Sequence, residues 1–323
     1  MLQAPQKVRF GDQVPPAIFP SIFGLLGLGL AWRRATDAFQ APSAFPDLIL
    51  GAVTLLFIFA TFAYLLKISR RPKVVVEDLR ILPGRAGLAA MVLSVYLLAA
   101  VLVPMNPAIA RGVLGAGLFA HIVLVILVLH SLITGPAEQR QVTPIWHLHF
   151  VGFIIAPLSA IPLGYQAACE VVLYVTGAIA VAIWCVSAVQ IIRRDPPPPL
   201  RPLLAIHLAP ASLLGTVSLM LGHIPAALVF AGWGALVLAA LLLRARYLTA
   251  AGFSPLWGAF TFPLAAYASL LLLLAAAVQS QGLRVAGGIA LLAGTLIIPV
   301  IAVKVMQAWA KGGLGAKTNA ARV

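Results

Sequence analysis

Long apolar stretches alternate with short polar connections along almost the whole chain. The stretch 253–279 is the clearest example. At about 1.5 Å per helical residue it is long enough to cross about 30 Å of hydrocarbon. Similar stretches predict an all-α integral membrane protein with ten transmembrane helices. They cover 16–32, 46–66, 86–104, 108–133, 143–164, 168–192, 201–221, 224–244, 253–279 and 284–308.

The connections are too short for anything but antiparallel neighbours. Residues 104–107 form nearly the whole connection between the third and fourth helices, and Gly222-His223 joins the seventh to the eighth. We therefore expect five helical hairpins. The pattern predicts a single transmembrane domain over 1–323, made of an N-terminal segment 1–15, a ten-helix bundle 16–308 and a tail 309–323.

Lys and Arg are concentrated on one side of this topology. The two terminal segments and the connections after even-numbered helices hold 18 of the 22. Positive charge in short loops marks the cytoplasmic side, so we expect both termini in the cytoplasm and a multi-pass protein of the inner, cytoplasmic membrane. The four cations on the other side are Arg33, Arg34, Arg111 and Arg284.

Interior prolines recur on odd-numbered helices. Pro20, Pro157, Pro210 and Pro263 lie in the first, fifth, seventh and ninth, and the last three are spaced at 53 residues. Each predicts a bend, because proline lacks an N–H and crowds the preceding turn. Bent helices are tolerated where neighbours or a water-filled cavity satisfy the freed carbonyls. We therefore expect an inner ring of odd helices around a central pore; proline-rich helices without such a ring are the alternative.

Composition agrees with a membrane protein. The 323 residues are 62% hydrophobic and 9% charged, where a soluble domain carries about 25% charged residues. The net charge of +14 is explained by the Lys and Arg residues of the cytoplasmic terminal segments and connections. Because the chain has no soluble basic domain, we do not expect it to bind nucleic acid. Cys169 and Cys185 suggest neither a disulfide framework nor a metal site, and we expect no cofactor.

Four segments carry a resemblance that covers essentially the whole chain. They are PPAIFPSIFGLLGLGLAW, WHLHFVGFIIAPLSAIPLGY, LRPLLAIHLAPA and LWGAFTFPLAAYA, in matching helix order. Together they resemble the tellurite-resistance/dicarboxylate transporter family, which includes the bacterial TehA-type proteins and the plant slow anion channels. The resemblance implies a pore lined by the five odd helices, a homotrimer in the lipid bilayer, and passage of small inorganic or carboxylate anions.

The same resemblance implies that a phenylalanine of the ninth helix closes the pore. The match places this gate at Phe262, directly before Pro263 and on the order of 10 Å inside the helix. A second pore-facing aromatic matches Phe19, although Pro20 follows it where a bacterial relative has glycine. A packed core ring is the alternative for either phenylalanine.

Two polar residues of odd helices, Thr261 and His207, are candidates to line the pore. A hydrogen-bonded structural histidine is the alternative for His207. Histidines on separate helices can also ligate iron, so a membrane haem protein is the enzyme-class alternative. We do not expect an enzyme.

The centres of the predicted helices carry no Asp, Glu, Lys or Arg. Such groups often mark proton relays in membrane proteins, so the pattern favours a gated passive channel that binds its ions weakly. The alternative is a secondary transporter of tellurite, sulfite or a C4-dicarboxylate coupled to the proton gradient. A structural or sensory membrane protein is a third interpretation. The preference for anions comes from the resemblance.

Overall fold

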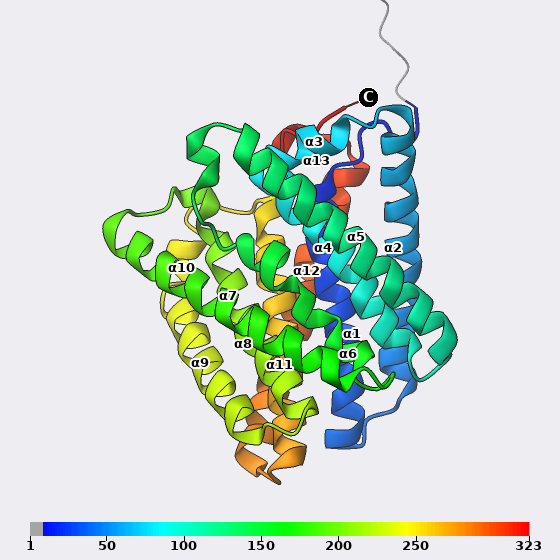
Figure 1. Cartoon of the computed structure of the whole chain (residues 1–323), viewed down its shortest axis with the longest axis vertical. Coiled ribbons are helices and arrows are strands. Elements are labelled where there is room, and N and C mark those ends of the chain that lie inside the picture. Colours follow the sequence, from blue (N-terminus) through cyan, green and yellow to red (C-terminus); the bar gives the residue numbers. More distant parts are fainter. Residues whose placement is uncertain (1–8, 323) are drawn as a thin grey trace, which may run out of the picture.

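The computed structural model describes residues 9–322, and every regular element in that range is a helix (Figure 1). Within it, nine helices are long and apolar enough to cross a membrane. Three of the nine begin with a 3-10 segment that continues into an α-helix. In chain order they are η1 (Pro16–Ile18) with α1 (Phe19–Phe39), α2 (Ala44–Arg70), α4 (Leu82–Leu102), α5 (Pro107–Thr134), α7 (Gln166–Arg193), η5 (Pro198–His207) with α8 (Leu208–Met220), α9 (Ile224–Leu243), η6 (Pro255–Phe260) with α11 (Thr261–Ala277), and α12 (Gln281–Ala310).

The fifth predicted helix is shorter and broken. The apolar segment His147–Ala160 consists of a π-helical turn, η3 (His147–Val151), a 3-10 turn, η4 (Gly152–Ile155), and a four-residue helix, α6 (Pro157–Ala160). The ten predicted spans are thus nine long helices and one short irregular segment. Short helices also lie in the connections: α3 (Val74–Leu79), η2 (Ala137–Arg140), α10 (Ala245–Leu248) and α13 (Gly313–Lys317).

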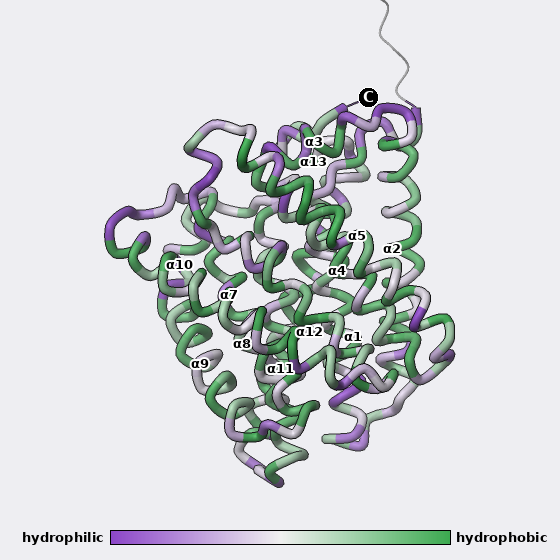
Figure 2. The backbone as a smooth tube through the Cα atoms, viewed as in Figure 1, coloured by the Kyte–Doolittle hydropathy of each residue, from purple (hydrophilic) through white to green (hydrophobic). Residues whose placement is uncertain are grey.

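Burial alternates between odd-numbered and even-numbered spans as expected, although the buried helix α4 has no proline beyond its first turn and the exposed helix α12 contains Pro299. In their most apolar stretches, η1–α1, α4, η5–α8 and η6–α11 are 67–83% buried, whereas α2, α5, α7, α9 and α12 are 17–39% buried. The second group carries many exposed apolar side chains, and Figure 2 shows that most of its residues are hydrophobic. A water-soluble monomer does not expose apolar side chains along five whole helices. This surface is therefore suited to contact with lipid. One example from each outer helix is Leu55, Phe119, Tyr174, Leu236 and Leu296.

Each of the four interior prolines lies in the first turn of an α-helix. Pro20 is the second residue of α1, Pro157 the first of α6, and Pro210 and Pro263 the third residues of α8 and α11. First-turn N–H groups have no intrahelical partner, so proline sacrifices no helical hydrogen bond there. A 3-10 segment precedes each of these helices. The predicted bends are therefore changes of helix type.

Both ends of the described chain pack at one end of the bundle (Figure 1). A fully buried ion pair holds them there: Lys67 Nζ lies 3.0 Å from Asp78 Oδ2, and both side chains are 0% exposed. Lys67 also donates to the carbonyl of Val14, just before η1, at 3.0 Å. The Ala321 amide and the Tyr64 hydroxyl donate to the Asp78 carboxylate at 2.8 and 2.9 Å. The pair thus joins the N-terminal segment and the C-terminal tail to α2 and α3.

Candidate functional site

Phe262, the second residue of α11, borders three cavities of the described chain. Two of them are small, about 40 and 20 Å³, and the third is a vestibule of about 350 Å³. The Phe262 side chain is 4% exposed and contributes to the wall of all three. Among the residues that line the vestibule, Phe262 is the one that also lines both small cavities.

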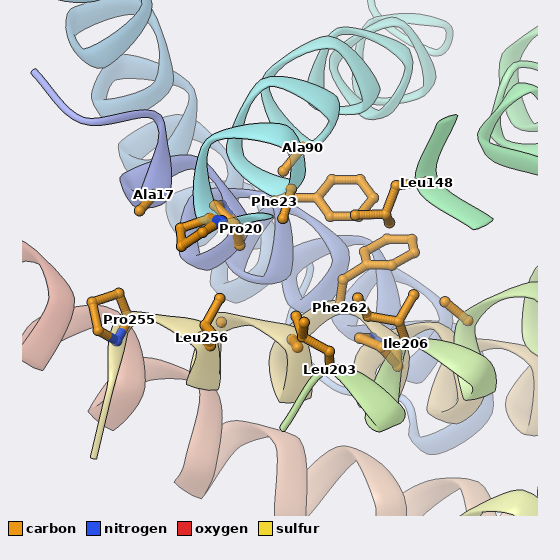
Figure 3. Close-up of a pocket in the computed structure, with 16 residues that line it drawn as sticks. Ala17, Pro20, Phe23, Ala90, Leu148, Leu203, Ile206, Pro255, Leu256 and Phe262 are labelled. Carbon is orange, nitrogen blue, oxygen red and sulfur yellow. The ribbon is translucent and has the colours of Figure 1, made fainter. Parts of the chain in front are cut away.

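Phe23 of α1 supplies the second ring at this position. Its centroid lies 3.8 Å from that of Phe262, and the two planes differ by 23°, a stacked arrangement. Phe23 lines both small cavities, and Figure 3 shows the two rings facing each other with Leu148 beside them. Aromatic stacking adds about 0.5–1.5 kcal/mol beyond the area buried, so the pair forms a defined contact between α1 and α11.

Two glycines of α1 allow α11 to approach this closely. A Cβ atom at Gly27 would lie 2.8 Å from Cδ2 of Phe262, and one at Gly24 would lie 2.1 Å from Oγ1 of Thr261. The Thr261 hydroxyl lies 2.6 Å from the Gly258 carbonyl and 3.0 Å from the Pro20 carbonyl. It is fully buried, and neither small cavity nor the vestibule includes it. Thr261 thus fastens α11 to α1 beside the aromatic pair.

The larger of the two small cavities is lined by residues with apolar side chains. Side chains from η1, α1, α4, η5 and η6 converge on it, and Figure 3 shows several of them around the two rings. A narrow apolar passage gives a hydrated ion nothing to replace its water shell, so such constrictions close by excluding water. Members of this wall besides the phenylalanines are Ala17, Ala90, Leu203, Ile206 and Leu256.

The vestibule differs from the small cavities because it contains charge. Arg33 and Arg34 line it together with Thr216 and Ser269. Arg33 is paired with Asp47 at 3.0 Å and also donates to a backbone carbonyl. Among residues 9–322, Arg34 makes no hydrogen bond or salt bridge. A cation in a cavity wall that no carboxylate neutralises, such as Arg34, raises the local concentration of anions.

The extent of α1 explains why sequence reasoning missed these arginines. The first helix was expected to end at residue 32, which would leave both in a connection. Instead α1 continues to Phe39 and carries Arg33 and Arg34 on helical backbone beside the vestibule. One signal for them was available, because they are half of the four cations on the sparsely charged side.

Phe19 lies elsewhere in the packing. It is fully buried, with its ring edge-to-face against Phe57 at 6.3 Å and Tyr64 at 6.2 Å, both on α2. The walls of the vestibule and the two small cavities do not include it. The ring that meets Phe262 is Phe23, one helical turn further along, which sequence reasoning did not single out.

His207 also faces away from Phe262. It is 8% exposed and lines a fourth cavity on the outer side of η5, between α7 and α9. Its Nδ1 lies 3.0 Å from Nε2 of His147, so one ring donates to the other. His147, on η3, lines the smallest cavity beside Phe262. The structure therefore places His147, and not His207, next to the aromatic pair.

Comparison with known proteins identifies the family of this chain. The family model described as voltage-dependent anion channel (SLAC1) matches residues 13–306, which include every residue of the site described above. No curated protein matches the chain. The match confirms the resemblance found in the four sequence segments, and the family is one of channels and transporters rather than enzymes. This multi-pass membrane protein therefore belongs to the voltage-dependent anion channel family.

Proposed function

We propose that this protein is a gated, passive channel for small anions in the inner, cytoplasmic membrane, closed by Phe262 together with Phe23. The observation that carries the proposal is the position of Phe262, which belongs to the walls of the vestibule and of both small cavities. Phe23, on which it stacks, lines both small cavities. An apolar closure of this kind opens when the ring moves and water enters.

The charges around the site support anions as the permeating species. Arg34 attracts anions into the vestibule. Within the described chain, the walls of the vestibule and the small cavities contain no Asp or Glu. A proton-coupled carrier commonly uses an intramembrane carboxylate, so these walls favour a passive path over coupled transport of tellurite, sulfite or a C4-dicarboxylate.

The proposed architecture is one transmembrane domain of five hairpins, with both termini in the cytoplasm and a pore inside the ring of odd helices. Consecutive inner and outer helices pack against one another in four pairs, α1 with α2, α4 with α5, α8 with α9, and α11 with α12. Both ends of the described chain lie at the same end of the bundle. The homotrimer remains part of the proposal through the family resemblance.

Anion flux into proteoliposomes tests the gate. Wild type and Phe262→Ala are compared with chloride, nitrate, sulfite and succinate, each with and without a pH gradient. We expect the variant to conduct about tenfold faster or more, equivalent to lowering the barrier by about 1.4 kcal/mol, without needing a gradient. Phe260→Ala is the matched control, because Phe260 is partly buried two residues earlier but lines neither the vestibule nor the small cavities.

Two outcomes of the flux assay would contradict a gate at Phe262. Wild-type flux that requires the pH gradient, with no increase in Phe262→Ala, would identify a coupled carrier in which Phe262 is a packing residue. Equal increases in Phe262→Ala and Phe260→Ala would mean that loosening η6 and α11, rather than removing a plug, opens the path.

A further inference from the structure

A lateral groove lies on the outside of the bundle, between α7, η5, α9 and α10. Its volume is about 780 Å³, larger than any cavity around Phe262. The rings of Trp184 on α7 and Trp233 on α9 meet across it, with centroids 5.7 Å apart. Both helices belong to the outer, exposed group, so the groove opens where the bundle faces lipid. Other apolar lining residues are Val181, Phe230, Val237 and Leu241.

The floor of the groove contains two buried polar atoms without partners. His207 and Ser187 are 8% and 6% exposed, and both line the groove. Within the described chain, neither Nε2 of His207 nor Oγ of Ser187 makes a hydrogen bond. An unsatisfied buried polar group costs about 1–3 kcal/mol. These atoms therefore favour an occupant that brings polar oxygens into an otherwise apolar space.

Two hydrogen bonds fix the position of His207 in the wall of the groove. Its Nδ1 is engaged with His147 at 3.0 Å, and Trp184 Nε1 donates to the His207 carbonyl at 3.3 Å. The hydrogen bond between His207 and His147 can have either ring as its donor. In both cases Nε2 of His207 has no partner in the described chain. The Ser187 hydroxyl can donate to an oxygen acceptor in either case. Nε2 of His207 and Oγ of Ser187 thus remain two potential hydrogen-bonding atoms in the wall of the groove.

Arg244 lies at the end of the groove, directly after the last residue of α9. Arg244 lines the groove, is exposed, and forms no salt bridge within residues 9–322. The neighbouring Arg201 is already engaged, because it pairs with Asp195 at 2.7 Å and stacks 3.9 Å from the centre of the Tyr247 ring. Arg244 lies 5.7 Å from the centre of the same ring but has no carboxylate partner in the described chain, so its charge is available to an anionic group at this end.

We propose that the groove binds one anionic phospholipid of the surrounding bilayer. An acyl chain lies along the wall that Trp184 and Trp233 form, the ester oxygens meet Ser187 and His207, and the phosphate binds Arg244. From Trp233 to Arg244, α9 rises by about 16 Å, a length that accommodates a headgroup, its glycerol and part of a chain. Basic sites between transmembrane helices bind anionic headgroups in this way. A soluble anion would leave the apolar wall uncovered.

Cys185 provides a direct reporter of occupancy. It is an exposed, free thiol that lines the groove, whereas Cys169 is buried. The purified full chain in a neutral detergent is titrated with phosphatidylglycerol or with phosphatidylcholine of the same acyl chains, and the rate of maleimide labelling is followed. We expect phosphatidylglycerol to slow labelling about tenfold, and native mass spectrometry to find one bound copy per chain. Phosphatidylcholine should protect several-fold less.

Two variants with matched controls locate the lipid. Arg244→Gln should abolish the preference for phosphatidylglycerol, while Arg246→Gln should keep it, because Arg246 is exposed on α10 but does not line the groove. Ala188→Trp should fill the groove and remove the bound lipid. Ala182→Trp, an exposed position of α7 outside the lining, should retain it.

Three outcomes would overturn the proposal. Labelling that is unaffected by either lipid means that none binds here. If both lipids slow the labelling of Cys185 equally, Arg244 does not select an anionic headgroup. Protection that appears without lipid and rises with protein concentration means that a second copy of the chain covers the groove.

Discussion

The ring of Phe262 on α11 stacks on the ring of Phe23 on α1, with centroids 3.8 Å apart. Phe19, four residues earlier on the same helix, instead packs edge-to-face against Phe57 and Tyr64 of α2. One helix therefore supplies one ring to the cavity walls and another to the packing of its outer neighbour. The two rings should respond differently to removal.

Replacing Phe23 tests whether the pair acts as one closure. We expect Phe23→Ala to raise anion flux about tenfold, as Phe262→Ala does, because either truncation opens the same contact. Phe19→Ala should leave flux near the wild-type level and instead lower the unfolding free energy by about 3–5 kcal/mol, the usual cost of truncating a buried aromatic ring. Flux assays and thermal unfolding in detergent measure the two effects. A flux increase confined to Phe19→Ala would reverse these assignments.

Removing the free charge of the vestibule should slow anion entry. In the Phe262→Ala background, where the path is open, Arg34→Gln should reduce flux about fivefold at low ionic strength. This corresponds to about 1 kcal/mol, the interaction of two unit charges near 4 Å in water. The difference should shrink as salt screens the charge. Arg284→Gln is the control, because Arg284 is exposed and does not line the vestibule; equal losses in both would point to general surface charge.

The glycines of α1 should tolerate no side chain where α11 crosses. In Gly24→Ala the new Cβ would lie 2.1 Å from Oγ1 of Thr261 and 3.1 Å from the Phe262 amide nitrogen. We expect a loss of about 1–3 kcal/mol, typical of overpacking, seen as a lower unfolding temperature. At Gly51 of α2 nothing lies within 4 Å, so Gly51→Ala should be neutral or stabilising by about 1 kcal/mol. Similar destabilisation in both would argue against the close crossing.

The buried ion pair should be required to hold the two ends of the chain. Asp78→Asn leaves Lys67 as an uncompensated buried cation, and breaking such a pair typically costs about 3–5 kcal/mol. The amide of Ala321 also loses its anionic acceptor. We expect a lower unfolding temperature and faster trypsin cleavage at Lys317 in the C-terminal tail.

The neighbouring pair provides the control for that prediction. Glu77 binds Arg71 with both side chains 38% exposed, and exposed ion pairs contribute about 0–1 kcal/mol. Glu77→Gln should therefore change the unfolding temperature little and leave cleavage at Lys317 unchanged. If Glu77→Gln frees the tail as much as Asp78→Asn does, surface charge rather than the buried pair holds it.

Much of the fold could be predicted because membrane insertion depends on linear properties of the chain. About twenty apolar residues in succession are needed to cross the hydrocarbon, so nine of the ten predicted spans correspond to long helices. The segment His147–Ala160 could not be predicted as irregular, since apolar residues fill π-helical and 3-10 turns as readily as an α-helix. The prolines lie where the helix type changes. The sequence alone does not show whether a proline belongs to the first turn of a helix or to its interior.

The sequence by itself determined the membrane-spanning class, the alternation of inner and outer helices and the family, and it singled out Phe262 as a candidate gate. These follow from local hydropathy, proline spacing and motifs, which need no knowledge of neighbours. Only the tertiary structure decided that Phe23 rather than Phe19 meets Phe262, that Arg34 faces a vestibule, and that His207 faces a lateral groove. The rotation of each helix about its axis decides these contacts. Packing against helices distant in the sequence fixes that rotation, and spacing along the chain does not encode it.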